Sequence, residues 1–255
     1  MMSELVRYDV DRAIATVTLD SPANRNALSA QLVGELTEHL AAAAADEAVR
    51  AVVLAHTGTV FCAGADLKEQ AAEGGPEQGT KRILALLRTV VELPKPVVAR
   101  IDGAVRAGGL GLIGACDIAL ASDNASFAFT EVRLGLAPAI ISLTTLGRMT
   151  ERAVSRYYLT GETFRARAAA DCGLITAAVD DLDFEITALA DSLRACSPQG
   201  LRETKPLTTR AALRRFGERA EDVQALSARL FASEEAREGM LAFLQKRAPR
   251  WAVEP

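Results

Sequence analysis

The chain has 255 residues, of which about half are apolar and a quarter charged, and its net charge is −4. This length allows one sizeable core, and the composition is ordinary for a globular protein. The mildly acidic balance argues against nucleic acid or an anionic membrane as partner, and no apolar run is long enough for a membrane span or a secretory leader. We therefore expect a cytoplasmic protein.

The predicted elements of the first half alternate between strands and helices. Ser29 is the expected N-cap of the first helix, and prolines 94 and 96 should end the second, because proline excludes helix. Between these two helices we expect a polar, glycine-rich and mobile connection at 71–79. Apolar runs and period-two alternation predict strands at 5–10, 13–19, 51–55, 97–101 and 118–121. Helices are expected at 29–45, 80–91 and 110–115.

The second half is predicted to be almost wholly helical. Gly161 and Gly173 stand where helix C-caps favour a residue with positive φ. The alternation in the first half predicts a layered α/β fold and excludes a helix bundle or a β-sandwich. The predicted helices span 140–149, 151–159, 166–172 and 184–196, followed by 200–247 in pieces.

The cysteines and histidines show no pattern that indicates a metal site or a nucleophile. There is no CxxC pair, and no spacing between the two residue types resembles a ligand set. Buried, reduced thiols and structural or surface histidines are the expected roles. The residues concerned are Cys62, Cys116, Cys172, Cys196, His39 and His56.

Two glycine-containing turns, at 63–66 and 107–111, each follow an apolar strand. Neither has the spacing of a phosphate-binding loop or of a dinucleotide-binding fingerprint. Such turns expose backbone N–H groups, and the second also opens a helix, whose free amides favour negative charge. Two converging amides can form an oxyanion hole, whereas tight strand-to-helix connections are the alternative interpretation.

An ordered set of motifs spans nearly the whole chain and resembles the enoyl-CoA hydratase/isomerase (crotonase) family. The motifs lie at 24–29, 61–69, 94–99, 102–109, 115–119, 127–136 and 238–247. The resemblance implies a crotonase-like spiral of ββα units in residues 1–195 and a helical C-terminal trimerisation region in residues 196–255. It also implies an acyl-CoA substrate, no separate cofactor, and a homotrimer or a dimer of trimers.

The family's functional residues map onto positions in this chain. The resemblance implies that the N–H groups of Ala65 and Gly108 form the oxyanion hole and that Glu131 is the catalytic carboxylate. Near the C-terminus, Phe243 and Lys246 are expected to reach a neighbour's coenzyme A, although a solvated helix-end cation is an equal alternative for Lys246. The other implied contacts with coenzyme A or substrate are Arg25, Ala63, Asp66, Leu67, Lys68 and Gly111.

One departure from the family pattern bears on the reaction. Typical hydratases carry a second glutamate after the glycine loop, where this chain has Gly111. A single carboxylate can still position water and return a proton. The stretch around Glu131 resembles bacterial hydratases of branched or carboxylated enoyl-CoAs, such as methylglutaconyl-CoA, that lack the first glutamate. A hydratase (a lyase of fatty acid metabolism) is therefore favoured, with Δ3,Δ2-enoyl-CoA isomerase or a decayed CoA-binding assembly protein as alternatives.

Three charged side chains near these motifs have competing interpretations. For Glu131 the alternative to catalysis is a salt bridge with a cation such as Arg133. Arg106, two residues before Gly108, could bind a substrate carboxylate or a phosphate, but an interface or surface ion pair is favoured. Asp66 is expected to fix its own turn by accepting hydrogen bonds from backbone amides.

Overall fold

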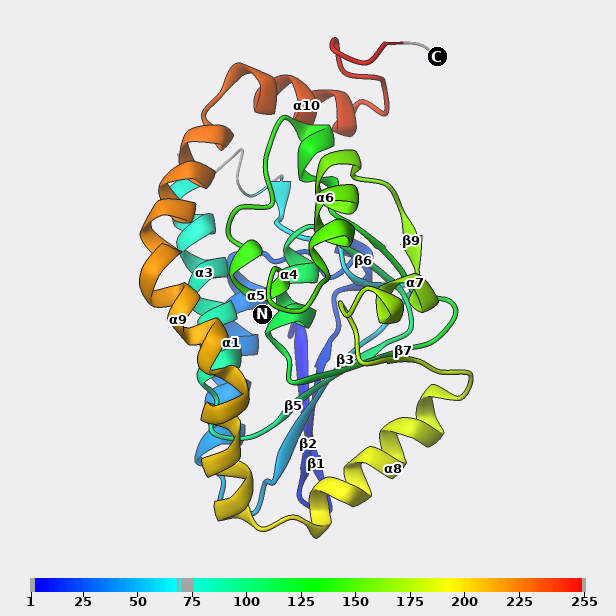
Figure 1. The fold of residues 1–255 in the computed structure, drawn as a ribbon, viewed down its shortest axis with the longest axis vertical. Coiled ribbons are helices and arrows are strands. Elements are labelled where there is room, and N and C mark those ends of the chain that lie inside the picture. The colour runs from blue at the N-terminus through cyan, green and yellow to red at the C-terminus, as the bar shows by residue number, and fades with distance from the viewer. Residues whose placement is uncertain (1–2, 68, 70–75, 254–255) are drawn as a thin grey trace.

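The computed structural model describes residues 3–67, 69 and 76–253. It confirms the layered α/β core and the helical C-terminal region (Figure 1). Its main sheet has six strands, of which the first two form an antiparallel hairpin and the rest run parallel. In sheet order these are β1 (Val6–Asp11), β2 (Ile14–Leu19), β3 (Ala51–His56), β5 (Val97–Ile101), β7 (Ile118–Ala121) and β10 (Ala177–Ala178).

A second, four-stranded sheet was not predicted from the sequence. Its strands have only two or three residues, too few to establish a period. Three of them directly follow strands of the main sheet, so each strand pair contributes one strand to each sheet before the chain turns onward. The strands are β4 (Val60–Cys62), β6 (Ala104–Arg106), β8 (Ser126–Ala128) and β9 (Phe164–Arg165).

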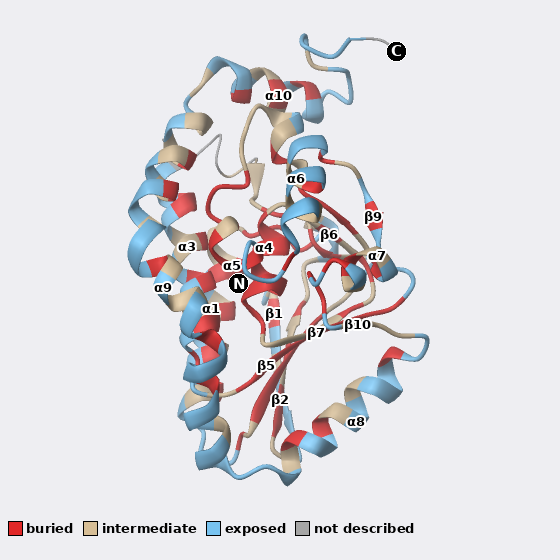
Figure 2. Ribbon diagram, in the orientation of Figure 1, coloured by how far each residue is buried: buried red, intermediate tan, exposed pale blue. Residues whose placement is uncertain are grey.

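Helices cover both faces of the main sheet (Figure 1). On one face lie α1 (Ala30–Ala45), α3 (Pro76–Glu92) and the long α9 (Pro198–Phe231). On the other lies α8 (Leu182–Ala195), which packs on the alternate side chains of the same strands. Strand β3 is therefore buried on both faces, as its continuous apolar run predicts (Figure 2).

The remaining helices are short, apart from the last. They are η1 (Pro22–Asn24), α4 (Gly108–Ala115), η2 (Thr130–Leu134), α5 (Ser142–Thr145), α6 (Glu151–Thr160), α7 (Ala166–Asp171) and α10 (Glu234–Leu244). The expected boundary at residue 196 falls between α8 and α9. No helix among the described residues is long and apolar enough to cross a membrane.

Several predicted boundaries are corrected by the structure. Helix α3 begins at Pro76, which suits the first turn of a helix, so residues 76–79 are not a loop. Residues 70–75 of that predicted mobile connection lie outside the described part of the chain. Helix α4 begins at Gly108, two residues earlier than expected. The helix predicted at 140–149 shortens to the four residues of α5, with turns on either side.

Helix capping follows the sequence where the signals are local. The Ser29 hydroxyl accepts the N–H of Leu32 at 3.3 Å and begins α1. Gly161 and Gly173 have φ of 59° and 87°, which confirms the positive values expected after α6 and α7.

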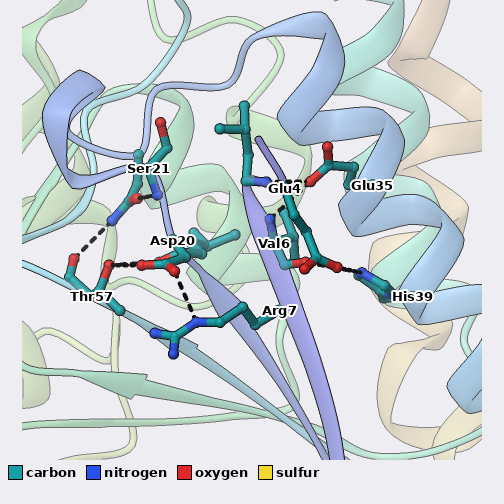
Figure 3. A network of polar contacts seen from close by, with 11 residues as sticks. Glu4, Val6, Arg7, Asp20, Ser21, Glu35, His39 and Thr57 are labelled. Carbon is teal, nitrogen blue, oxygen red and sulfur yellow. Dashed lines mark hydrogen bonds and ion pairs between the residues drawn. The ribbon is translucent and has the colours of Figure 1, made fainter. Parts of the chain in front are cut away.

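Polar contacts tie α1 to the first hairpin (Figure 3). The Glu35 carboxylate accepts the N–H groups of Leu5 and Val6, at 2.6 and 2.9 Å. His39 Nε2 lies 3.0 Å from the carbonyl oxygen of Val6, and because that oxygen can only accept, the imidazole donates. The ring also stacks on Tyr8. His39 therefore has a structural role.

A buried lysine fixes α9 to the core. Lys205 is 4% exposed, and its ammonium lies 3.0 Å from the Asp117 carboxylate. It also donates to the carbonyl oxygens of Val90 and Lys95, at 3.0 and 2.9 Å. These partners satisfy a charge that would otherwise be costly to bury. Burial lowers the pKa of Lys205.

Candidate active site

The loop after β4 carries the first candidate amide, that of Ala65. Gly64 has a φ of 90°, and a Cβ placed there would lie 2.9 Å from the Ala107 side chain and 3.1 Å from the Gly108 nitrogen. Only glycine allows this conformation and this close approach. The Gly64 carbonyl also accepts the N–H of Leu28, at 2.8 Å. The loop is thereby pressed against the turn that carries the second amide.

That second turn holds Gly108 at the start of α4. Ala107 before it has a φ of 45°, an unfavourable value for a residue with a side chain. As the first helical residue, Gly108 has an N–H with no acceptor inside the helix. A Cβ on Gly108 would lie 3.7 Å from the Ala65 nitrogen, so the two residues are neighbours. In the described part of the chain neither N–H donates to another residue.

Glu131 lies in η2, the turn that follows β8. It is 8% exposed, and its Oε2 has no hydrogen-bond partner among the described residues. Burial raises the pKa of this carboxyl to about 7. The alternative salt bridge with Arg133 is not present, and the Arg133 Nε donates instead to the Thr160 carbonyl at 3.4 Å. Among the described residues no cation pairs with the buried carboxyl, which is poised to exchange a proton near neutral pH.

Ala65, Gly108 and Glu131 line one cavity of about 450 Å³. Its walls are mainly apolar, as expected of a site for a small organic ligand. The last two helices complete one side, with Ser227 and Phe231 from α9 and Phe243 and Leu244 from α10. No chemical signal in the sequence distinguishes Ser227, Phe231 or Leu244, since an amphipathic helix carries such residues in any case.

The structure brings most of the predicted contact residues to this cavity. Phe243 lines the cavity of its own chain, whereas the sequence analysis assigned it to a neighbour's coenzyme A. Lys246 and Gly111 are not among the lining residues, and Lys68 lies outside the described residues. The predicted residues that do line it are Arg25, Ala63, Ala65, Asp66, Leu67, Gly108, Glu131 and Phe243.

The space beside Gly111 is filled by an isoleucine. A Cβ on Gly111 would lie 2.5 Å from Ile141 Cγ2 and 3.1 Å from Leu87 Cδ1. Ile141 itself lines the cavity. Gly111 therefore lies behind Ile141, and it leaves room for this side chain instead of for a substrate. Sequence spacing could not reveal the substitution, because Ile141 lies thirty residues further along the chain.

Arg106 also lines the cavity. Among the described residues its guanidinium donates to neutral oxygens: the carbonyls of Val105 and Ser126 and the Ser126 hydroxyl, at 2.6–3.0 Å. Within the described chain no carboxylate pairs with it, so the favoured surface ion pair is absent there. Burial lowers the pKa of Arg106, and the positive charge of nearby Arg165 lowers it further.

Two carboxylates anchor the Ala65 loop. Asp66 accepts the side-chain N–H of Asn24 at 2.7 Å and the backbone N–H of Glu69 at 3.2 Å. This confirms that Asp66 fixes its own turn. Glu69 in turn accepts the N–H of Ala30 at the start of α1, at 2.8 Å to Oε2. The position of the Ala65 amide thus depends on η1 and α1, to which these two carboxylates tie the loop.

The cysteines and His56 take no part in this site. Three of the four thiols are buried, and Cys196 is exposed. His56 Nε2 accepts the N–H of Asp102 at 3.1 Å, which is a structural contact. No group of histidine, cysteine, aspartate or glutamate within the described ranges could hold a metal ion.

Burial of Glu131 should make folding stability depend on pH. The folded-state pKa of about 7 exceeds the ordinary 4.5, so the folded chain holds this proton more tightly than the unfolded chain does. The resulting stabilisation is complete below about pH 4.5 and is lost as pH rises through 7. Glu131→Gln cannot ionise and escapes this loss. The quantity to compare is the free energy of unfolding of Glu131→Gln minus that of the wild type. We expect this difference to be about 2 kcal/mol larger at pH 8 than at pH 5.5. Urea titrations at the two pH values measure this, and equal differences would contradict a raised pKa.

Comparison with known proteins adds a family to this geometry. A family model described as enoyl-CoA hydratase/isomerase matches residues 9–254. The crystal structure of an enoyl-CoA hydratase from Mycobacterium avium is 54% identical, with a TM-score of 0.92, over 98% of this chain and 100% of that one. One from Mycobacterium smegmatis is 33% identical with a TM-score of 0.79, over 98% of this chain and 100% of that one. A 2,3-dehydroadipyl-CoA hydratase of Escherichia coli K12 is 32% identical over 97% of this chain and 98% of its own length.

Proposed function

Because the chain belongs to the enoyl-CoA hydratase/isomerase family, we propose that it is an enoyl-CoA hydratase, which adds water across the 2,3 double bond of an enoyl-CoA thioester. One observation carries this proposal. A buried carboxyl with an unpartnered oxygen, Glu131, shares one cavity with two backbone amides that have no partner in the described chain, those of Ala65 and Gly108.

In the proposed mechanism the two N–H groups donate hydrogen bonds to the thioester carbonyl oxygen. As water attacks C3, negative charge moves from the double bond to that oxygen and forms an enolate. Each amide donor of this kind contributes about 3–4 kcal/mol to the transition state. The close contact of Gly64 with the Gly108 turn holds the Ala65 amide, and the start of α4 holds the Gly108 amide. Both amides therefore need no reorganisation during the reaction.

Glu131 is assigned both proton transfers. As a carboxylate it takes a proton from the attacking water, and as the acid it returns a proton to C2 of the enolate. A pKa of about 7 suits both steps at neutral pH, since neither protonation state is strongly disfavoured. The apolar walls around it limit competing water.

The lining also supports a thioester with a charged carrier, whose acyl group enters a mainly apolar cavity. Arg25 at the rim is assigned to coenzyme A, as are the backbone groups of 63–67. The acyl group is proposed to be branched or carboxylated. Two points support a carboxylated chain: the name of the Escherichia coli relative, whose substrate is 2,3-dehydroadipyl-CoA, and Arg106, which has no carboxylate partner in the described chain.

Δ3,Δ2-enoyl-CoA isomerase is the second candidate, and the contact between Gly111 and Ile141 favours it. Where hydratases of the family have a second carboxylate, this chain has Gly111 packed against the apolar side chains of Ile141 and Leu87. Moving a proton between C4 and C2 needs only one base. The relatives named as hydratases keep hydration ahead.

The decisive experiment is product analysis with crotonyl-, 3-methylcrotonyl-, 3-methylglutaconyl- and 3-hexenoyl-CoA. A hydratase yields products heavier by one water, whereas an isomerase converts 3-hexenoyl-CoA into a product of equal mass and different retention.

The double variant Gly111→Glu/Ile141→Gly supplies a second carboxylate together with the room for it, and should raise hydration of crotonyl-CoA without raising isomerisation. If no substrate is converted while coenzyme A esters still bind, the enzyme assignment is wrong and the decayed binding protein is favoured.

A further inference from the structure

Helix α10 touches the turn that carries Glu131 through two glycines. Gly135 ends that turn with a φ of 71°, and a Cβ on it would lie 2.7 Å from the carbonyl carbon of Glu235. A Cβ on Gly239 would lie 2.5 Å from the carbonyl oxygen of Leu134. Both distances are shorter than any real Cβ contact, and both involve backbone that cannot rotate away. Helix and turn therefore meet backbone to backbone.

The turn transmits this contact to the catalytic carboxylate. The N–H groups of Gly135 and Leu136 both donate to the carbonyl oxygen of Glu131, the latter at 3.0 Å. A shift of residues 134–136 would therefore carry the Glu131 backbone with it. The Glu131 carboxylate has no partner in the described chain that would hold its Oε2 in place, so its position depends on the backbone.

The same helix closes the cavity at its other end. Phe243 and Leu244, at the end of α10, line the cavity although each is about half exposed. The segment that follows the helix is tied back to it by Glu238, which pairs with Arg247 at 2.7 Å and with Arg250 at 3.7 Å. One rigid element thus reaches both the turn that carries the carboxylate and the cavity rim.

We propose that the contacts of Gly135 with Glu235 and of Gly239 with Leu134 form a positioning joint, through which α10 sets the place of Glu131 and seals the cavity around it. Gly135 and Gly239 are positioning residues, since neither lines the cavity. The joint rests on the proposed function in so far as Glu131 is the acid and base of the reaction.

The joint also explains why Glu131 stays dry. If α10 moved outward, water would reach the carboxyl and its pKa would fall from about 7 toward the ordinary value of 4.5. In the described part of the chain, the other ionisable groups near Glu131 are Tyr158 of α6, whose pKa is raised by burial and by the Glu131 charge, and those that line the cavity. The latter are Arg25, Asp66, Arg106 and Arg133, and none of them lies in α10.

Gly239→Ala tests the joint. The added methyl group must push α10 from the turn, whereas Gly217→Ala places the same methyl group on exposed α9, where nothing lies within 4 Å. We expect Gly239→Ala to lower kcat on the order of tenfold or more, because misplacement by a fraction of an ångström is costly in catalysis. We expect it to lower the Glu131 titration midpoint by about one pH unit. Gly217→Ala should change neither quantity.

The midpoint is measured without substrate, from the infrared carbonyl band of protonated Glu131, identified by its loss in Glu131→Gln. Gly135→Asn repeats the test from the other side of the contact, since asparagine tolerates positive φ, and it serves if Gly239→Ala does not fold. A folded variant of either glycine with wild-type kcat and midpoint would overturn the joint, even if it were less stable. If the wild type converts no enoyl-CoA but the midpoint shifts as expected, the proposed function fails and the joint stands.

Discussion

Replacing Glu131 by glutamine is expected to lower kcat on the order of a hundredfold or more while acyl-CoA binding is retained. Glutamine keeps the shape of the side chain and can still form hydrogen bonds, but it cannot accept a proton from water. The rate is followed by loss of the conjugated enoyl thioester, and binding by calorimetry with a saturated acyl-CoA. Glu162→Gln, which makes the same change in an exposed ion pair with Arg156, is the control and should keep wild-type activity. Equal rates in wild type and Glu131→Gln would remove the carboxylate from the mechanism.

The pH profile gives the same prediction a second measurement. The carboxylate form acts as the base, and its pKa of about 7 means that this form is depleted below neutrality. In the wild type kcat/KM should therefore fall about tenfold for each pH unit below 7 and level off above it. The residual activity of Glu131→Gln should lack this limb.

Gly108→Pro is the second change with a large expected effect. Proline removes the N–H outright, and at the first position of a helix that N–H has no acceptor within the helix. Loss of one oxyanion donor should reduce kcat by a factor on the order of 100 or more. Glu151→Pro, at the first position of α6, is the matched control, since it introduces the same ring away from the cavity. Circular dichroism and thermal unfolding establish that both variants fold. Full activity in folded Gly108→Pro would refute the role of this amide.

The sequence was a good guide to elements whose pattern is long enough to show a period. The strands around Val53, Ala99 and Ala119 and the helix begun by Ser29 are all present. The small sheet was missed because strands such as Val60–Cys62 exist only through pairing with partners some forty residues away in the chain. The helix expected from Ile140 was overpredicted for a related reason. Ile141, in the turn before α5, packs against Gly111, whereas Thr144 and Thr145 of α5 pack against Gly114. The segment therefore does not form one continuous helical stripe.

In the candidate site, too, the residues that belong to local motifs were predictable and those brought in by distant packing were not. Motifs placed Ala65, Gly108 and Glu131, which the structure brings into one cavity, because each depends on a local turn. What surrounds these residues depends on distant packing, and no spacing rule predicts that Ile141 fills the space beside Gly111. The same holds for α10, which lies over its own chain's cavity and contributes Phe243 to it.

The contribution of α9 and α10 to the cavity has a consequence for biosynthesis. The carboxylate and both amides lie within the first 131 residues, so they leave the ribosome long before Ser227, Phe231, Phe243 and Leu244. Lys205, which fixes α9 to the core, also bonds to residues more than a hundred positions earlier. Until the last helices are translated, the nascent chain holds the three proposed reacting groups but only part of the cavity wall. The complete cavity therefore forms only after α10 has been made, and a chain that terminates after α9 would carry Glu131 without the contact between α10 and its turn.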